Sequence, residues 1–306
     1  MNDPRTSTGA ASADDWRIDR ARAVALFGAH AQDWPIEIVE ETGSTNADLM
    51  ARVKALPRKP GALARPIVRV AYLQTAGRGR RGRPWYAEPG NALLFSVACV
   101  LPRPLEGLAG LSLAVGVALV DGLRSLPLTG SGPGQIALKW PNDVLFEGDK
   151  LAGILIETAW STADASAVVI GIGTNVKGAD ALAEKIGALQ ANVPAQARGA
   201  TPTALSRALP SANLTDTLAA ELNALEPALQ RFAVEGFAPF RQRWNGCHAY
   251  AGRDVVLIEQ GVEVARGVAA GVDESGQLLL DTARGRETIA TGDVSLRLAG
   301  AAEGAA

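Results

Sequence analysis

The chain has 306 residues, of which 47% are apolar and 20% are charged, and its net charge is −2. This length suffices for about two domains, and the apolar share excludes a chain that is disordered throughout. A net charge near zero argues against a dedicated nucleic-acid binder, which usually carries a basic excess. The two cysteines, Cys99 and Cys247, are too few for a disulfide framework and fit a reducing cytosol.

The N-terminal region indicates a tail followed by one helix. Residues 1–15 are mostly small or polar, so we expect a disordered tail, and a helix is predicted over 19–29. No signal peptide is recognisable, and no apolar run reaches the roughly 18 residues of a membrane span. Fewer than about 40 residues precede the first core strand, which is too few for a winged helix domain. We therefore expect no DNA binding.

The first polar cluster follows a predicted strand. Residues 36–40 alternate between apolar and polar, and they lead through Ser44-Thr45-Asn46 into a helix predicted over 47–54. Thr45 or Asn46 can cap that helix, because hydroxyl and amide oxygens accept bonds from the free N–H groups of a first turn. The same side chains can instead bind a polar ligand, and both interpretations stay open at this point.

The second polar cluster is rich in arginine and glycine. A buried strand is predicted over 67–73, and it is followed by four arginines and three glycines in the seven residues from Gly77 to Arg83. Glycine lets a backbone approach a ligand closely, and guanidinium groups suit carboxylate and phosphate. This arginine loop is therefore suited to hold an anion beside a sheet, although a solvated basic loop has the same composition.

The remaining elements before residue 250 alternate between strands and helices. The predicted strands cover 91–101, 136–140, 144–146, 151–158 and 166–174, and the predicted helices cover 108–126, 214–232 and 237–244. Pro227 predicts a kink or break in the second of these helices. Short turns between consecutive strands favour an α+β fold, with a mixed, largely antiparallel sheet and helices on one side. Residues 179–210 are rich in alanine and proline, and we expect a short helix, a surface loop and a further helix near Leu205, with no assigned role.

The character of the chain changes after residue 250. About five short strands separated by glycine or acidic turns are predicted within 251–298, which favours a small SH3-like β-barrel. We therefore expect a main domain over 16–250, this second domain, and a disordered tail over 299–306. Two further polar clusters, 139–153 and 171–175, lie at predicted strand ends. If all four clusters open into one cleft, it suits a substrate with a carboxylate, a polyphosphate and an apolar body.

These clusters resemble the motifs of the biotin–protein ligases, also called biotin–[acetyl-CoA-carboxylase] ligases. The matching motifs are Gly77–Arg83 with Trp85, Lys139-Trp140-Pro141-Asn142-Asp143, Lys150-Leu151-Ala152-Gly153-Ile154-Leu155-Ile156-Glu157 and Ser44-Thr45-Asn46. The resemblance covers roughly residues 36–298 and implies a catalytic domain similar to that of class II aminoacyl-tRNA synthetases. It implies that biotin and Mg-ATP give biotinyl-5'-AMP and pyrophosphate, after which the ε-amine of a carrier lysine attacks the mixed anhydride.

The resemblance also implies roles for individual residues. Lys150 and Arg80 would be catalytic, and Asp143 would face the Mg²⁺ ion of the ATP. The residues implied in biotin binding are Ser44, Thr45, Gln74, Arg78, Arg80, Lys150 and Gly153. The residues implied in ATP and adenylate binding are Arg78, Arg80, Arg81, Arg83, Trp85, Asn142, Asp143 and Asn175. The implied partner is the biotin carboxyl carrier protein of acetyl-CoA carboxylase, in the cytoplasm and without a membrane, and the enzyme would be a monomer or a weak homodimer.

One departure and several alternatives accompany this resemblance. Thr174 stands where the family often has isoleucine or valine, and we expect that change to be tolerated. A nucleic-acid binder is disfavoured by the net charge, and neither a phosphate-binding P-loop nor a complete dinucleotide fingerprint is present. His30 and His248 are not clustered, which disfavours a Ser-His-Asp site. A ligase for lipoate or octanoate is the nearest alternative enzyme, and the arginine loop favours biotin over it.

Overall fold

A computed structural model describes residues 16–28, 33–129, 135–191, 200–259, 261–290 and 294–299. The two predicted disordered tails lie outside this range, except for Ala299, whose backbone N–H donates to the carbonyl of Asp254 at 2.9 Å. His30 also lies outside the described residues. The predicted boundary between the two domains, at residue 250, stays a prediction.

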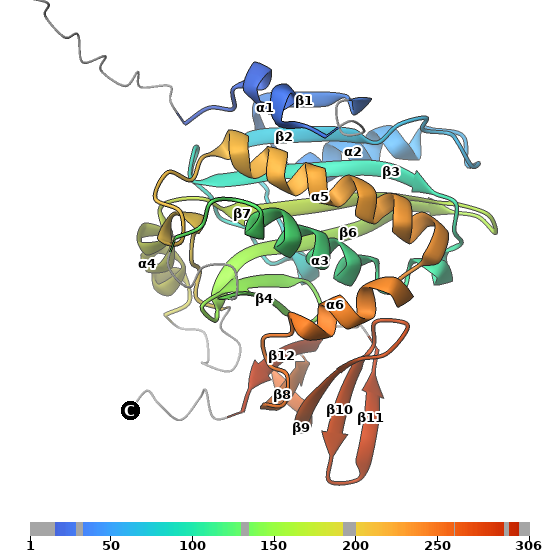
Figure 1. The fold of residues 1–306 in the computed structure, drawn as a ribbon, viewed down its shortest axis with the longest axis vertical. Helices are drawn as coiled ribbons and strands as arrows, with labels where there is room; N and C mark the ends of the chain where they lie inside the picture. Colours follow the sequence, from blue (N-terminus) through green and yellow to red (C-terminus); the bar gives the residue numbers. More distant parts are fainter. Residues whose placement is uncertain are drawn as a thin grey trace, which may run out of the picture.

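The larger sheet has seven strands in the order β1-β2-β3-β7-β6-β5-β4 (Figure 1). The strands are β1 (Ile36–Thr42), β2 (Ile67–Gln74), β3 (Ala92–Leu101), β4 (Ile136–Lys139), β5 (Asp143–Phe146), β6 (Asp149–Ser161) and β7 (Ser166–Asn175). Strands β1 and β2 pair in parallel, and every other pair is antiparallel. This arrangement confirms the predicted mixed, largely antiparallel sheet.

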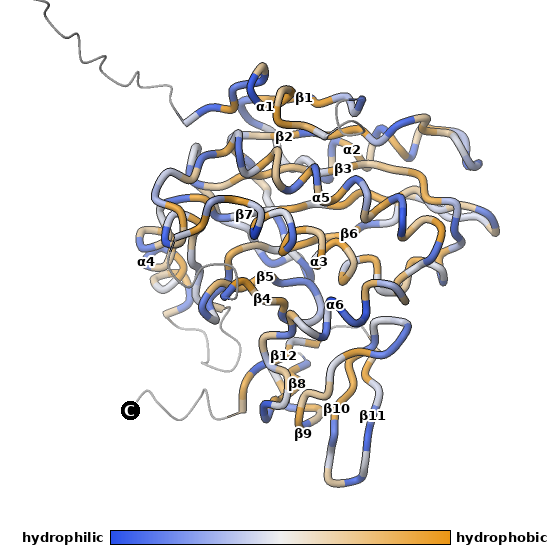
Figure 2. The backbone as a smooth tube through the Cα atoms, in the orientation of Figure 1, coloured by the Kyte–Doolittle hydropathy of each residue, from blue (hydrophilic) through white to orange (hydrophobic). Residues whose placement is uncertain are grey.

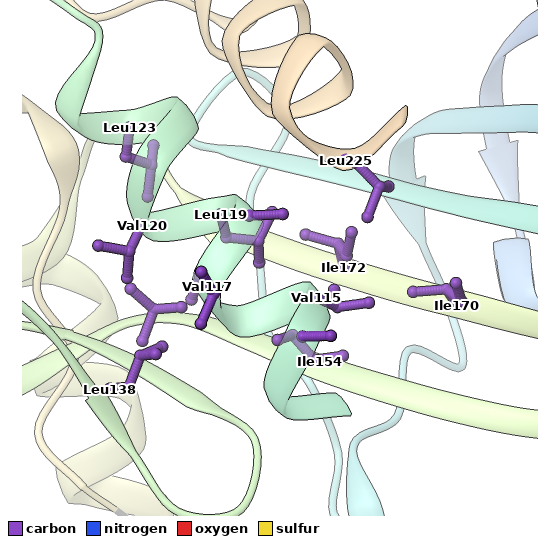
Figure 3. Close-up of a cluster of buried hydrophobic side chains, with 14 of the residues drawn as sticks. Val115, Val117, Leu119, Val120, Leu123, Leu138, Ile154, Ile170, Ile172 and Leu225 are labelled. Carbon is purple, nitrogen blue, oxygen red and sulfur yellow. The ribbon is translucent and has the colours of Figure 1, made fainter. Parts of the chain in front are cut away.

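Helices cover both faces of this sheet. On one face lie α3 (Leu111–Arg124) and α5 (Leu214–Glu235), which pack on alternate residues of β7 such as Ile170 and Ile172 (Figure 3). On the other face lies α2 (Thr45–Lys54), which packs through Leu49 and Val53 on the intervening residues Ala167 and Val169. Because side chains alternate between the faces of a strand, β7 has two apolar faces. The prediction of helices on one side was therefore wrong.

Helices α3 and α5 bear on two further sequence predictions. The segment Leu105–Arg124 is long and apolar enough to cross a membrane by length and composition, but α3 is mostly buried as a core helix. Helix α5 runs through Pro227, so a break there is excluded, and the alternative of a kink stays a prediction. Pro227 and Asn223, four residues earlier, are both exposed, so the carbonyl that loses its N–H partner lies on the solvent side.

The other helices are short. They are α1 (Arg20–Leu26), α4 (Ala179–Leu189), α6 (Arg241–Gly246) and the 3₁₀ turns η2 (Arg80–Gly82), η3 (Leu105–Leu108), η6 (Leu205–Arg207) and η7 (Ala238–Phe240). Helix α4 and turn η6 agree with the helical segments expected within 179–210. Helix α1 is fixed to α5 by an ion pair between Arg22 and Asp216, with 2.8 Å between the guanidinium and the carboxylate.

The smaller sheet is a separate antiparallel unit at the C-terminal end of the chain (Figure 1). Its strands are β8 (Asp254–Glu259), β9 (Val262–Val272), β10 (Leu278–Thr282), β11 (Gly285–Ile289) and β12 (Val294–Leu298), in the order β11-β10-β9-β8-β12. The predicted five strands are confirmed, and their closure into an SH3-like barrel stays a prediction. The indole of Trp140 donates to the carbonyl of Gly276 at 3.1 Å and links this sheet to the larger one.

Figure 2 shows that hydrophobic residues concentrate along the central strands of the larger sheet.

Candidate active site

A cleft of about 520 Å³ lies on the face of the larger sheet that carries α2. Every residue implied for the site lines it: Ser44, Thr45, Gln74, Arg78, Arg80, Arg81, Arg83, Trp85, Asn142, Asp143, Lys150, Gly153 and Asn175. These residues come from four separated stretches of the chain, and the strand order brings them together. The roles that the resemblance implies for them stay predictions.

Glycines form part of the floor of the cleft. Gly153 of β6 and Gly173 of β7 lie directly opposite each other in the antiparallel register. The ring of Trp85 lies against both, because a Cβ added at Gly153 or Gly173 would come within 2.9 Å or 2.7 Å of it. Distances this short are not seen for real Cβ atoms, so the indole can take this place only above residues without side chains.

The arginine loop is folded back on itself and contacts three separate elements. Its backbone is closed by bonds from Gly79 N to Arg83 O, at 2.7 Å, and from Trp85 N to Gly77 O, at 2.9 Å. The guanidinium of Arg78 pairs with Glu157 of β6 at 3.1 Å. Two others reach further elements: Arg80 donates to Asn142 Oδ1 at 3.5 Å, and Arg81 donates to Ser295 Oγ of β12 at 3.4 Å. The loop therefore contacts the larger sheet through Arg78 and the smaller sheet through Arg81.

Two lysines share one carboxylate at the centre of the site. Lys150 Nζ lies 2.6 Å from Asp143 Oδ1, and Lys139 Nζ lies 3.3 Å from Asp143 Oδ2. Burial by itself raises the pKa of Asp143, but Lys150 and Lys139 more than offset it, so the pKa lies below its usual value. The Lys150 ammonium also lies 5.4 Å from the ring centre of Trp85, within reach of a cation–π contact.

Two asparagines are held by backbone carbonyls. Asn142 Nδ2 donates to Ile154 O at 2.8 Å, and Asn175 Nδ2 donates to Thr203 O at 3.0 Å. Among the described residues, Asn175 Oδ1 and Trp85 Nε1 are buried without a hydrogen-bond partner. Buried polar atoms are nearly always paired in proteins, so these two are candidates for a ligand contact.

The polar cluster at the start of α2 is arranged differently from the predicted cap. Ser44, rather than Thr45 or Asn46, is the N-cap, and its side chain accepts from Ala47 N at 3.4 Å. Thr45 and Asn46 are inside the first turn and face the cleft. Gln74 Oε1 accepts from Thr45 N at 2.8 Å, so the strand end of β2 is fixed to the helix start.

Three features in or directly behind the cleft were not predicted from the sequence. Ser96 and Glu157 bond to residues of the first cluster, and Glu157 belongs to a motif that the resemblance contained without a role for it. Leu182 and Ile186 of α4 line the cleft within the segment that had no assigned role. The residues of β12 form a further wall: Val294, Ser295, Leu296, Arg297 and Leu298. No sequence signal near the other clusters points to β12.

The described residues offer a poor fit to a resident metal. They contain no group of three or more His, Cys, Asp or Glu side chains arranged to hold an ion. The expected Mg²⁺-facing residue, Asp143, has each of its oxygens close to a lysine ammonium. Mg²⁺ is commonly bound through one or two carboxylates together with substrate phosphates. Asp143 as it stands is therefore engaged by lysines rather than free for a metal.

Comparison with known proteins identifies the family. Residues 58–175 match the model described as "Biotin/lipoate A/B protein ligase family", and residues 251–297 match "Biotin protein ligase C terminal domain". The biotin--[acetyl-CoA-carboxylase] ligase of Paracoccus denitrificans is 36% identical over 265 residues, covering 84% of this chain and 98% of that protein. The bifunctional ligase/repressor BirA of Escherichia coli is 34% identical over 265 residues, covering 86% of this chain and 74% of that protein.

The fold agrees with these relatives. The biotin protein ligase of Aquifex aeolicus, solved in complex with biotin and ATP, superposes with a TM-score of 0.65 at 26% identity. The match covers 87% of this chain and 99% of that one. Together with the cleft and its motifs, these similarities show that the chain belongs to the biotin protein ligase family.

Proposed function

We propose that the cleft holds biotin and ATP side by side and that its lysines and arginines join them. The chain is a biotin–protein ligase: it activates biotin with ATP to biotinyl-5'-AMP, releasing pyrophosphate, and transfers the biotinyl group to a protein lysine. The observation that carries the assignment to this cleft is the meeting of Lys150 with the arginine loop above the glycine floor. No nucleophilic side chain is required.

Charge neutralisation is the main task in the first step. The carboxylate of biotin attacks the α-phosphate of ATP, so two anions must approach each other. We assign Lys150 to the position between them and Arg80 to the stabilisation of the phosphate charge, since both line the cleft. The second ammonium, that of Lys139, stays 3.3 Å from Asp143 and can keep this carboxylate paired when Lys150 turns to the substrates. Positioning of both reactants then lowers the barrier further.

The two ends of the cleft have different chemistry. Ser44, Thr45 and Gln74 offer hydroxyl and amide groups to the ureido ring of biotin, with Gly153 leaving room on the sheet. Trp85, Asn142 and Asn175 surround the end that we assign to the adenylate, where the unpaired Trp85 Nε1 and Asn175 Oδ1 lie. We assign Arg78, Arg81 and Arg83, which also line the cleft, to the region between these ends.

The remaining assignments are finer proposals. We propose that Mg²⁺ enters with the phosphates of ATP and neutralises part of their charge, while Asp143 positions the lysines. We propose that residues 16–250 form the catalytic domain and residues 251–298 a second domain that completes the cleft wall. The carrier would be the biotin carboxyl carrier protein of acetyl-CoA carboxylase. Two free, buried cysteines support a reducing, cytoplasmic location.

One assay separates this function from the nearest alternative. Pyrophosphate release from ATP is measured with biotin, with lipoate and with neither acid. We expect release that depends on biotin, followed by covalent labelling of a biotin carboxyl carrier domain when it is added. Release that depends on lipoate and not on biotin would replace this proposal with a lipoate ligase.

A further inference from the structure

We propose that Glu157, Asn46 and Ser96 form a directional hydrogen-bond relay that fixes the hydroxyl hydrogen of Thr45. The relay would make the site selective for a substrate ring that carries an N–H group at that place. The inference rests on the proposed function, in which Thr45 and Gln74 contact the ureido ring of biotin. Ser96 is fully buried and does not line the cleft, so it acts through Thr45 as a positioning residue.

The direction of the relay begins at Glu157. This carboxylate pairs with Arg78 at 3.1 Å and accepts from Asn46 Nδ2 at 2.8 Å. Asn46 Nδ2 also lies 3.3 Å from the carbonyl oxygen of Leu155. Both neighbours are acceptors, so the amide nitrogen must face β6 and the amide oxygen must face away from it.

Ser96 passes this direction on to Thr45. Its hydroxyl lies 2.6 Å from Asn46 Oδ1, which can only accept, so Ser96 donates its single hydrogen to Asn46. The same Ser96 oxygen lies 2.7 Å from Thr45 Oγ1. Since the hydrogen of Ser96 is already used, Thr45 must be the donor of this second bond.

The result is a pair of hydrogen-bond acceptors in the lining of the cleft. Thr45 Oγ1 lies 3.1 Å from Gln74 Oε1, within donating distance, and that oxygen already accepts from Thr45 N at 2.8 Å. The Thr45 hydroxyl has a single hydrogen, and Ser96 Oγ at 2.7 Å is the nearer of its two acceptors. When the hydrogen goes to Ser96, the oxygens of Thr45 and Gln74 meet with lone pairs facing each other. A ligand N–H relieves this contact, whereas a ligand oxygen at the same place worsens it. The ureido ring of biotin carries two N–H groups.

Packing holds the relay in one arrangement. Asn46 is 4% exposed, and Ser96 is fully buried. A Cβ added at Gly171 would lie 2.3 Å from Asn46 Oδ1, so Asn46 can lie on the sheet only because glycine stands below it. If these hydrogen bonds served only to stabilise the fold, they would satisfy the buried groups without affecting which ligand binds. The experiment must therefore measure the choice of ligand as well as stability.

The test compares biotin with its two cyclic carbamate analogues, in each of which a ring oxygen replaces one ureido N–H. Binding to the full chain is measured by calorimetry without ATP. We expect the native protein to bind biotin about tenfold or more tightly than one of the carbamates. In Ser96→Ala, the Thr45 hydroxyl becomes free to donate to Gln74 or to a ring oxygen. Biotin affinity should then fall about tenfold and the preference over that carbamate should narrow, with kcat at saturating biotin within about twofold of native.

Two variants control for packing. Ser166→Ala removes another fully buried serine, bonded to Ser161 Oγ at 2.7 Å at the far end of β7, and should leave the ligand preference unchanged. Ser96→Thr keeps the hydroxyl, so it should keep the native preference for biotin over that carbamate. An unchanged preference in Ser96→Ala refutes the relay, and so does a native protein that binds both carbamates as tightly as biotin. The comparison of biotin with the two carbamates in the native protein still tests the relay if Ser96→Ala fails to fold. A native protein that does not bind biotin refutes the proposed function instead.

Discussion

Glu221 of α5 should set part of the pH dependence of stability. The carboxyl group is fully buried behind the site, and its Oε1 accepts from the hydroxyl of Thr174 at 2.7 Å. Its other oxygen has no hydrogen-bond partner among the described residues. Burial raises the pKa of Glu221 from 4.5 to about 8, and the bond from Thr174 offsets only part of this rise. The carboxyl group is therefore protonated in the folded protein at neutral pH.

The sign and the size of the effect follow from proton linkage. Between pH 4.5 and about 8 the folded protein holds a proton at Glu221 that the unfolded chain has lost. The free energy of unfolding therefore falls as pH rises, by about 1.4 kcal/mol per pH unit for one proton. The full contribution is present below pH 4.5 and is lost as pH rises through 8. At pH 7 the accumulated loss is about 3 kcal/mol.

Replacing Glu221 with glutamine tests this reasoning. Glutamine has nearly the same shape but does not titrate, so Glu221→Gln should gain stability relative to native as pH rises from 6 to 8. Urea unfolding at pH 6, 7 and 8 should show the difference growing by about 1 kcal/mol per pH unit. The exposed Glu235→Gln on the same helix should show a difference that does not change with pH. A difference between native and Glu221→Gln that stays constant over this range would refute the buried, protonated carboxyl.

Three further predictions concern the active site. Lys150→Ala should slow biotinyl-AMP formation about 10²-fold or more, because one charge that offsets the anion repulsion is lost, and pyrophosphate release measures this; a near-native rate would refute the role. Gly173→Ala should displace the Trp85 ring, which a Cβ would approach within 2.7 Å, and weaken adenylate binding about tenfold or more, which calorimetry with a stable adenylate analogue would detect. Arg80→Gly should release biotinyl-AMP, so that an unrelated bystander protein becomes labelled on its lysines; an unlabelled bystander and a normal lifetime of bound adenylate would exclude a retaining role for this loop.

Much of the architecture could be predicted because its strands carry clear patterns. The residues of β3 and β7 are almost wholly apolar and end in glycine or turn signals, which places both in the middle of a sheet. The site residues could be predicted for a related reason. They follow strand ends or lie in motifs with distinctive spacing, and the register between β6 and β7 brings Gly153 and Gly173 to one place.

The side of the sheet on which α2 packs could not be predicted from the helix itself. Its inward-facing residues, Leu49 and Val53, show only that one face is buried. The deciding feature is that β7 is apolar on both faces, which allows a helix on each. The cap was misassigned for a similar reason. Ser44, Thr45 and Asn46 are all good caps by residue type. Thr45 N donates to Gln74 and Asn46 Oδ1 accepts from Ser96, so both residues are engaged elsewhere and Ser44 is the cap.

The contribution of β12 depends on contacts between distant parts of the chain, and it changes how the arginine loop should be understood. Arg297 of β12 lines the cleft, and burial followed by the nearby charge of Arg83 lowers the pKa of Arg297. Arg81 donates to Ser295 on the same strand. Like charges from the arginine loop and from β12 thus lie near each other at the cleft, and a polyphosphate between them would convert repulsion into attraction. The smaller sheet is therefore expected to contribute to ATP binding through β12, in addition to closing the cleft.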